Sequence, residues 1–204
     1  MNYPVSFPAI VILAGGQSKR LGSPKQLLQL DGTTLLAHTV AVAQELGAGP
    51  VAVVLGAHAE LIFPAIEQAG VDIIHNPAWQ EGMASSLRAG VEQVTLLYPK
   101  TDGILFLVCD QPFMGTDLLR GLIDLQKTAD LPVAASRYSE RLGTPALFHQ
   151  SVFDRLMALT GDTGARKMLE GMADKVAVLD FDNGVYDIDT REDYERLLTY
   201  KNIL

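Results

Sequence analysis

The stretch AIVILAGGQSKRLGSPK, residues 9–25, decides the fold, because a continuous apolar run passes directly into a turn rich in glycine and cations. The apolar half is rich in β-branched residues and suits a strand buried on both faces of a mostly parallel sheet. Gly15 and Gly16 follow this strand and allow close approach to a ligand and backbone angles that other residues avoid. Arg20 and Lys25 supply a planar guanidinium and a mobile ammonium for phosphate. The stretch therefore predicts a cradle for a nucleoside triphosphate.

The spacing of this turn separates it from two other phosphate-binding patterns. A dinucleotide fingerprint needs G-x-G-x-x-G, and a Walker A loop needs Lys directly after a glycine five positions beyond the first. Residues 13–25 match neither pattern.

Length and composition indicate a globular protein with one domain. The chain has 204 residues, and domains usually hold about 100 to 200, so we expect a single domain over residues 1–204. No apolar run reaches the roughly 18 residues of a membrane span, and residues 1–8 lack the features of a signal peptide. We therefore expect a cytoplasmic protein without a membrane partner.

Cysteine content and charge exclude further classes. The single cysteine, Cys109, excludes an internal disulfide and a cysteine-rich zinc site, and we expect it to pack in the core. The net charge of −8 argues against nucleic acid as a partner, because a phosphate backbone would be repelled. A local cluster of cations must therefore hold any anionic substrate.

Strand-like and helix-like segments alternate along the chain, which predicts an α/β fold: a Rossmann-like, mostly parallel sheet in a three-layer α/β/α sandwich. The expected strands are residues 9–13, 51–55, 71–74, 104–108, 132–136, 175–179 and 185–188. The expected helices are residues 35–46, 57–69 with a kink or break at Pro64, 83–97, 115–128, 152–159, 164–172 and 190–199.

The motif CDQP, residues 109–112, places Asp110 at the carboxyl end of an expected strand. Ligands bind at this edge of open α/β sheets, and Mg²⁺ prefers one or two carboxylates together with phosphate oxygens. Asp110 is therefore a candidate metal ligand. Alone, the motif fits a turn formed by Asp and Pro equally well.

A second acidic motif is YDIDTRED, residues 186–193. Thr190 and Asp193 resemble a helix capping box, which leaves Asp187 and Asp189 free. Alternation along a strand would put these two carboxylates on one face.

The segment HNPAWQEGMASSL, residues 75–87, joins an expected strand to an expected helix and suits contact with a base or ribose. Ser85 or Ser86 would cap the helix or line the site, and the helix N-terminus would favour an anion. In isolation an ordinary loop anchored by Trp79 is the better interpretation.

Together, the glycine turn, CDQP and YDIDTRED resemble the MobA-like nucleotidyltransferase family, and especially its molybdenum cofactor cytidylyltransferases. The resemblance runs from about residue 10 to residue 197. Two further stretches resemble the family's acceptor side, RLGTPALF at 141–148 and GDTGAR at 161–166, although each could be a simple turn. Cys109 and the scattered histidines have no implied catalytic task.

The resemblance implies a set of site residues and a Mg²⁺ cofactor. Catalysis is expected from Arg20, Lys25 and Asp110. Asp110 and Asp189 are the expected metal ligands, and Asp187 is the second candidate for the position given to Asp189. Nucleotide binding is expected from Leu13, Ala14, Gly15, Gly16, Arg20, Lys25, Asn76, Ser86 and Asp110, and acceptor binding from Gly143, Pro145 and Arg166.

The implied reaction joins a nucleoside monophosphate to the terminal phosphate of a molybdopterin-type cofactor. Gly15 matches the guanylyl branch, whereas CDQP, GDTGAR and YDIDT match the cytidylyl branch, so CTP is favoured over GTP. A sugar-phosphate or polyol-phosphate nucleotidyltransferase is the first rival and a nucleotide sensor without activity the second. The resemblance also implies a molybdoenzyme or chaperone as a partner that receives the product.

Overall fold

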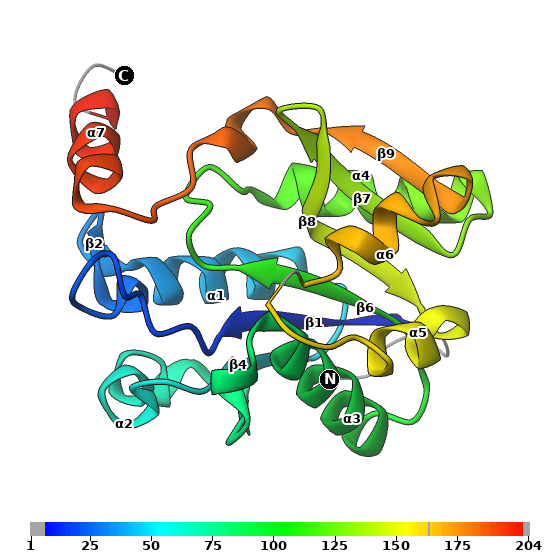
Figure 1. Ribbon diagram of the computed structural model, residues 1–204, viewed down its shortest axis with the longest axis horizontal. Coiled ribbons are helices and arrows are strands. Elements are labelled where there is room, and N and C mark those ends of the chain that lie inside the picture. Colours follow the sequence, from blue (N-terminus) through cyan, green and yellow to red (C-terminus); the bar gives the residue numbers. More distant parts are fainter. Residues whose placement is uncertain (1–6, 163, 202–204) are drawn as a thin grey trace.

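The computed structural model describes residues 7–162 and 164–201 of the chain (Figure 1). Its strands are β1 (Phe7–Ala14), β2 (Gln29–Leu30), β3 (Thr33–Thr34), β4 (Val51–Leu55), β5 (Asp72–His75), β6 (Thr101–Val108), β7 (Val133–Tyr138), β8 (Arg141–His149) and β9 (Val176–Asp180). Its α-helices are α1 (Leu35–Leu46), α2 (Ala59–Ile62), α3 (Met83–Leu97), α4 (Thr116–Ala129), α5 (Phe153–Met157), α6 (Arg166–Glu170) and α7 (Arg191–Lys201). None of these helices is long and apolar enough to cross a membrane.

Seven strands form one sheet in the order β5-β4-β1-β6-β8-β7-β9, and β2 pairs with β3 in a separate hairpin. β1 pairs in parallel with β4 and β6, and β4 with β5, whereas β8 runs antiparallel to both of its neighbours. The expected mostly parallel sheet is confirmed. The carboxyl ends of β1, β4 and β6 consequently meet at one edge, where α/β sheets bind ligands.

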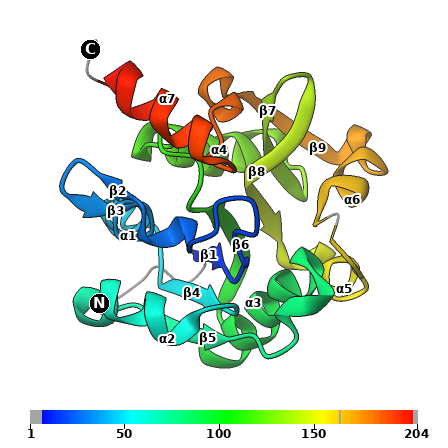
Figure 2. The ribbon, with the colours of Figure 1, turned by 60° about the vertical axis from the view of Figure 1, so that its left-hand side comes forward.

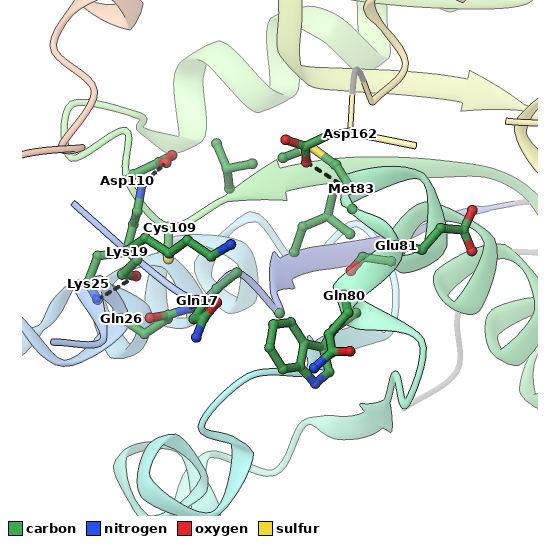
Figure 3. Close-up of a pocket in the computed structure, with 18 residues that line it drawn as sticks. Gln17, Lys19, Lys25, Gln26, Gln80, Glu81, Met83, Cys109, Asp110 and Asp162 are labelled. Carbon is green, nitrogen blue, oxygen red and sulfur yellow. Dashed lines mark hydrogen bonds and ion pairs between the residues drawn. The ribbon is translucent and has the colours of Figure 1, made fainter. Parts of the chain in front are cut away.

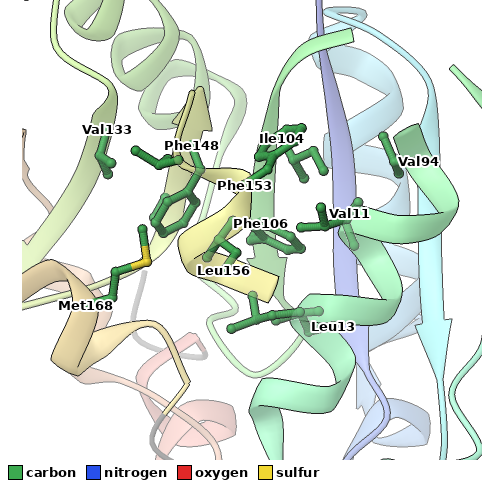
Figure 4. Close-up of a cluster of buried hydrophobic side chains, with 14 of the residues drawn as sticks. Val11, Leu13, Val94, Ile104, Phe106, Val133, Phe148, Phe153, Leu156 and Met168 are labelled. Carbon is green, nitrogen blue, oxygen red and sulfur yellow. The ribbon is translucent and has the colours of Figure 1, made fainter. Parts of the chain in front are cut away.

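Both faces of the sheet are buried against helices, which confirms the three-layer arrangement. The odd-numbered residues of β1, such as Val11, pack with α3, α5 and α6 around Phe106 and Phe148 (Figure 4). The even-numbered residues, such as Ile12, pack with α1, α2 and α4. Since side chains alternate along a strand, the uninterrupted apolar run of β1 serves two cores at once.

Local capping signals act as expected at two helices. Thr34 accepts a hydrogen bond from the Ala37 N–H at the start of α1, and Gly47 ends that helix in the left-handed conformation. At α7, the Asp193 carboxylate accepts from the Thr190 N–H and hydroxyl, and Thr190 Oγ1 accepts from the Asp193 N–H. This reciprocal arrangement is the predicted capping box.

α7 lies beside the β2–β3 hairpin and apart from the two helical layers (Figures 1 and 2). A small cluster of Leu30, Leu35, Ile188 and Leu197 holds it there. The Tyr194 hydroxyl adds a hydrogen bond of 2.8 Å to the Gln29 carbonyl. The C-terminal segment therefore returns to the region of the glycine turn.

The helix expected at 57–69 is interrupted near Pro64, as predicted, into α2 and two 3-10 turns, because proline cannot donate an N–H inside a helix. Two other features differ from the sequence expectations. Residues 185–188 pair with no strand; Asp182–Val185 is a short 3-10 helix, and the Ile188 N–H donates a single hydrogen bond to the Asp110 carbonyl. β8 was not expected at all.

The turn before β8 explains why the sequence did not indicate this strand. Ser139 and Glu140 both have positive φ, at 46° and 59°, and together connect β7 to β8. Such two-residue hairpin turns normally carry Asn-Gly or Asp-Gly. Gly143 and Pro145 also interrupt the alternating pattern that identifies strands.

Candidate nucleotide site

A cavity of about 620 Å³ opens at the carboxyl ends of β1 and β6. The glycine turn and Asp110 form one side, and the loop before α3 together with Asp162 forms the other (Figure 3). Of the residues expected to bind nucleotide, six line this cavity: Leu13, Gly15, Gly16, Lys25, Ser86 and Asp110.

The remaining expected residues lie outside the cavity lining. Ala14 is buried beneath the turn, and Arg20 projects toward the C-terminal segment. Asn76 is buried behind Ser86. Two of the expected acceptor residues, Gly143 and Pro145, belong to β8. The third, Arg166, is exposed at the start of α6.

Lys25 connects the two acidic motifs. Its Nζ lies 2.8 Å from Asp110 Oδ2 and 2.7 Å from Asp189 Oδ1, and only 16% of its side chain is exposed. Burial alone would lower the pKa of Lys25, but the charge and hydrogen bonds of Asp110 and Asp189 outweigh it and raise this pKa. The lysine therefore stays charged and bridges carboxylates that are distant in sequence.

Arg20 holds the other oxygen of the same carboxylate, with its guanidinium 2.6 Å from Asp189 Oδ2. Burial raises the pKa of Asp189, but the bonds and charges of Lys25 and Arg20 outweigh this effect and lower the pKa overall. The side chain of Arg20 is 67% exposed, so its ion pair contributes little to stability.

Asp187 lies near this group but, among the described residues, forms no ion pair with Lys25 or Arg20. Burial and the negative charges of Asp189 and Asp110 raise the pKa of Asp187. The three carboxylates therefore generate a negative potential that Lys25 and Arg20 do not fully cancel.

These residues fit the magnesium ion that the resemblance implies. Lys25 Nζ already occupies a cation position between Asp110 and Asp189, and carboxylate oxygens are hard ligands suited to Mg²⁺. Among the described residues, no group of three or more His, Cys, Asp or Glu side chains is arranged to hold a metal. Two carboxylates completed by phosphate oxygens and water match the way proteins usually bind Mg²⁺ with a nucleotide.

The two glycines of the turn act by size rather than by backbone angle. Neither Gly15 nor Gly16 has a positive φ, so the expectation of unusual dihedrals is wrong there; Ser18, at 55°, takes that conformation instead. A Cβ on Gly15 would stand 3.1 Å from the Ser86 hydroxyl, whereas one on Gly16 would meet nothing within 4 Å. Gly15 packs closely against Ser86 in the first turn of α3, and Gly16 leaves open space beside the turn.

Gln26 fixes the path of the turn, which the sequence reasoning missed. Its buried Nε2 donates to the carbonyls of Ala14 and Gly16 at 2.8 and 3.1 Å. The Ser18 hydroxyl oxygen also accepts from the Lys25 N–H at 3.0 Å. The only signal in the sequence was that the polar residue Gln26 follows Lys25. Its position did not indicate that its amide would bind the Ala14 and Gly16 carbonyls.

The loop before α3 is held by Asn76, although not in the way expected. Its Nδ2 lies 2.8 and 3.0 Å from the hydroxyl oxygens of Ser85 and Ser86, so these serines are not helix caps. The first N–H groups of α3 pair with another loop: Ala84 donates to the Gly161 carbonyl at 3.1 Å, and Met83 lies 3.4 Å from Asp162 Oδ1. The expected anion position at this helix N-terminus is therefore already filled by protein.

Arg88 connects the loop before α3 to the loop that follows α5. Its guanidinium lies 2.9 and 2.6 Å from the two Glu81 oxygens and donates to the Leu159 carbonyl at 2.5 Å. The Glu81 hydrogen bonds raise the pKa of Arg88. Neither residue was singled out from the sequence, because their partner segment is distant along the chain.

Cys109 is buried below the cavity, as expected. Burial and the neighbouring Asp110 raise the pKa of its thiol to about 12. It therefore remains protonated and is a poor nucleophile.

The acceptor-side glycine contacts an aromatic residue. A Cβ on Gly143 would collide with the Tyr138 phenol, and the Pro145 carbonyl accepts from the Ser136 hydroxyl at 2.9 Å. Gln111, next to Asp110, is buried with its Oε1 unpartnered among the described residues. The acceptor roles of Gly143, Pro145 and Arg166 stay predictions.

Gly82 allows the two loops to meet. Its φ is 114°, and an added Cβ would lie 2.7 Å from both the Asp162 Cα and the Gly161 carbonyl oxygen. We predict that Gly82→Ala destabilises the protein by about 2 kcal/mol or more and lowers Tm by about 4–8 °C. In Gly16→Ala the added Cβ meets only open space, so its Tm should stay within about 1 °C of the wild-type Tm. Thermal unfolding compares them, and equal Tm values for both variants would contradict the assigned packing.

The chain is similar to several known proteins. A model of the family described as MobA-like NTP transferase domain matches residues 10–176. Nicotine blue oxidoreductase of Paenarthrobacter nicotinovorans is 31% identical, over 92% of this chain and 95% of that protein. A probable molybdenum cofactor guanylyltransferase of Bacillus cytotoxicus is 24% identical, over 94% and 96%.

Among solved structures, Rv0371c of Mycobacterium tuberculosis H37Rv has a TM-score of 0.83 and 34% identity, covering 96% of this chain and 100% of that chain. Its complex with manganese has a TM-score of 0.79 and 31% identity, with coverages of 95% and 98%. Since the family model matches well over half of the sequence, this protein belongs to the MobA-like NTP transferase family of nucleotidyltransferases.

Proposed function

We propose that this protein transfers a nucleoside monophosphate, with CTP as the favoured donor, to the terminal phosphate of a molybdopterin-type cofactor. The observation that carries the proposal is the Lys25 ammonium held between Asp110 and Asp189 at the mouth of a nucleotide-sized cavity. This arrangement places a phosphate-binding cation and two metal-type ligands together. The relative named as a molybdenum cofactor guanylyltransferase supports the acceptor class.

The reaction requires positioning and charge neutralisation more than proton transfer. An oxygen of the acceptor phosphate bonds to the α-phosphorus of the triphosphate, and the bond from that phosphorus to the β-phosphate oxygen breaks, releasing pyrophosphate. A phosphate monoester is already largely ionised near neutral pH, so no strong general base is needed. Lys25 and Arg20 would turn toward phosphate oxygens and stabilise the charge on the leaving pyrophosphate.

Asp110 and Asp189 would hold the divalent metal ion, with Asp187 adding negative potential beside them. When bound, Mg²⁺ would lower the charge repulsion between the reacting phosphates. The manganese complex of a similar protein supports a divalent ion in this role.

The choice between CTP and GTP rests on few residues. Gly15, typical of the guanylyl branch, and the guanylyltransferase relative favour GTP. The CDQP, GDTGAR and YDIDT segments resemble the cytidylyl branch and favour CTP. We therefore keep CTP as the proposed donor and GTP as the second candidate.

The test is pyrophosphate release by the purified protein with Mg²⁺ and molybdenum cofactor, comparing CTP, GTP, ATP and UTP. We expect release that depends on the cofactor and is at least about tenfold faster with CTP, since one good base contact discriminates by about 1–3 kcal/mol. Faster release with GTP would assign the second candidate. If none of the four is turned over, the acceptor is wrong, and sugar and polyol phosphates become the acceptors to test.

Asp110→Ala tests the metal ligand. Turnover should fall at least about 100-fold, because charge stabilisation at the reacting phosphates is lost. Asp124→Ala removes an exposed carboxylate of α4 outside the cavity and should keep full turnover. Circular dichroism and Tm check that both variants fold. Retained activity with an unchanged magnesium dependence in Asp110→Ala would remove this residue from the mechanism.

Lys25→Met tests whether the lysine competes with the metal. Without nucleotide, Mn²⁺ should bind this variant at least about tenfold more tightly than the wild type, because a charge of like sign leaves the site. Lys19→Met is the matched control, since Lys19 lines the same cavity but makes no ion pair among the described residues. Electron paramagnetic resonance of free Mn²⁺ measures the affinity. Equal gains in both variants would indicate only a long-range charge effect.

A further inference from the structure

We propose that Asp162 recognises the exocyclic amino group of the nucleobase and so makes this protein prefer cytosine to uracil. The inference rests on the proposed function, because it assigns a base contact within the same cavity. In the motif GDTGAR, the residue expected to bind a substrate was Arg166, which lies outside the cavity, and Asp162 had no expected binding role.

The cavity has two chemically different ends (Figure 3). Lys19, Lys25 and Asp110 lie at one end, and Gln80 and Asp162 lie toward the other. Under the proposed function, the triphosphate would lie at the end with Lys25 and Asp110, with the lysines toward its phosphate oxygens and the carboxylates toward its divalent metal ion. The base must then extend toward the end that holds Asp162.

Apart from the Gln80 amide, few polar groups at this end are available to bind a base. The Glu81 carboxylate is occupied by Arg88, and the Ser86 hydroxyl oxygen is within 3.0 Å of Asn76 Nδ2. Asp162 is exposed to the cavity and enters no ion pair with any described residue. Its Oδ1 is 3.4 Å from the Met83 N–H, which leaves the carboxylate most of its capacity to accept hydrogen bonds.

The neighbouring contacts fix the position of Asp162. The Gly161 carbonyl accepts from Ala84, and the Leu159 carbonyl accepts from Arg88. Gly82 brings its own backbone so close to Asp162 that a Cβ would not fit between them. A carboxylate held in this way binds without first having to be ordered, which favours affinity and selectivity.

A carboxylate accepts hydrogen bonds and cannot donate them. Cytosine presents an amino group at position 4, which is a donor, whereas uracil presents a carbonyl oxygen there. Asp162 would attract the first and repel the second. Leu13 and Val108 line the same cavity and supply apolar surface for the ring.

The decisive variant is Asp162→Asn, which keeps the size of the side chain and its acceptor oxygen toward Met83 but adds an amide donor. Dissociation constants for CTP and UTP are measured by calorimetry on the wild type and the variant, without acceptor. Loss of a negative charge strengthens binding of both triphosphates alike, so the ratio of the two constants isolates the base contact. Asp174→Asn, an exposed residue outside the cavity, controls for the charge change.

We expect the wild type and Asp174→Asn to bind CTP at least about tenfold more tightly than UTP, and Asp162→Asn to lose about tenfold of that ratio. An unchanged ratio in Asp162→Asn, or no preference in the wild type, would overturn the assignment of Asp162 and leave the proposed transferase function standing. If no nucleoside triphosphate binds the wild type, the proposed function itself fails.

Discussion

The arrangement of the site depends on the bridge from the Lys25 ammonium to Asp110 and Asp189. These carboxylates lie 85 and 164 residues from Lys25 in sequence, so one partly buried cation connects the glycine turn, the end of β6 and the C-terminal segment. The Ile188 N–H strengthens the connection by donating to the Asp110 carbonyl at 3.0 Å. Without the lysine, only the exposed Arg20 would offset the charges of Asp110, Asp187 and Asp189, which is costly for partly buried carboxylates.

Sequence patterns predicted the parts of the fold that depend on neighbouring residues. The β1 strand follows from its apolar run, and the ends of α1 from Thr34 and Gly47, because buried strands and helix caps are local features. The strand assignments that failed also have local causes. The turn between β7 and β8 uses Ser139 and Glu140 in a backbone conformation that Gly or Asn usually adopts. Residues after Val185 resemble a strand but find no partner in the sheet.

The sequence indicated candidate site residues only where a motif carried its own chemistry. Asp110 and Lys25 could be chosen because acids at strand ends and lysines after glycine turns suggest phosphate chemistry. The contacts of Arg88 and Asp162 could not be inferred, because their partners come from distant segments, and those of Gln26 could not, because they depend on how the glycine turn folds back. Arg88 donates a hydrogen bond to the Leu159 carbonyl, and Gln26 donates to two carbonyls of the glycine turn. Long-range hydrogen bonds of this kind leave no periodic or spaced pattern in one sequence.

The electrostatics of the cavity limit how strongly the empty protein attracts anions. Lys25 and Arg20 are both neutralised by carboxylates, so a triphosphate must take these cations away from Asp110 and Asp189. That exchange releases two carboxylates, which then require another cation, and Asp187 beside them makes the need greater. Nucleotide and divalent metal should therefore bind with positive coupling, each lowering the electrostatic cost of the other, since coupling between two ligands is reciprocal. The same exchange would keep free phosphate from binding tightly on its own.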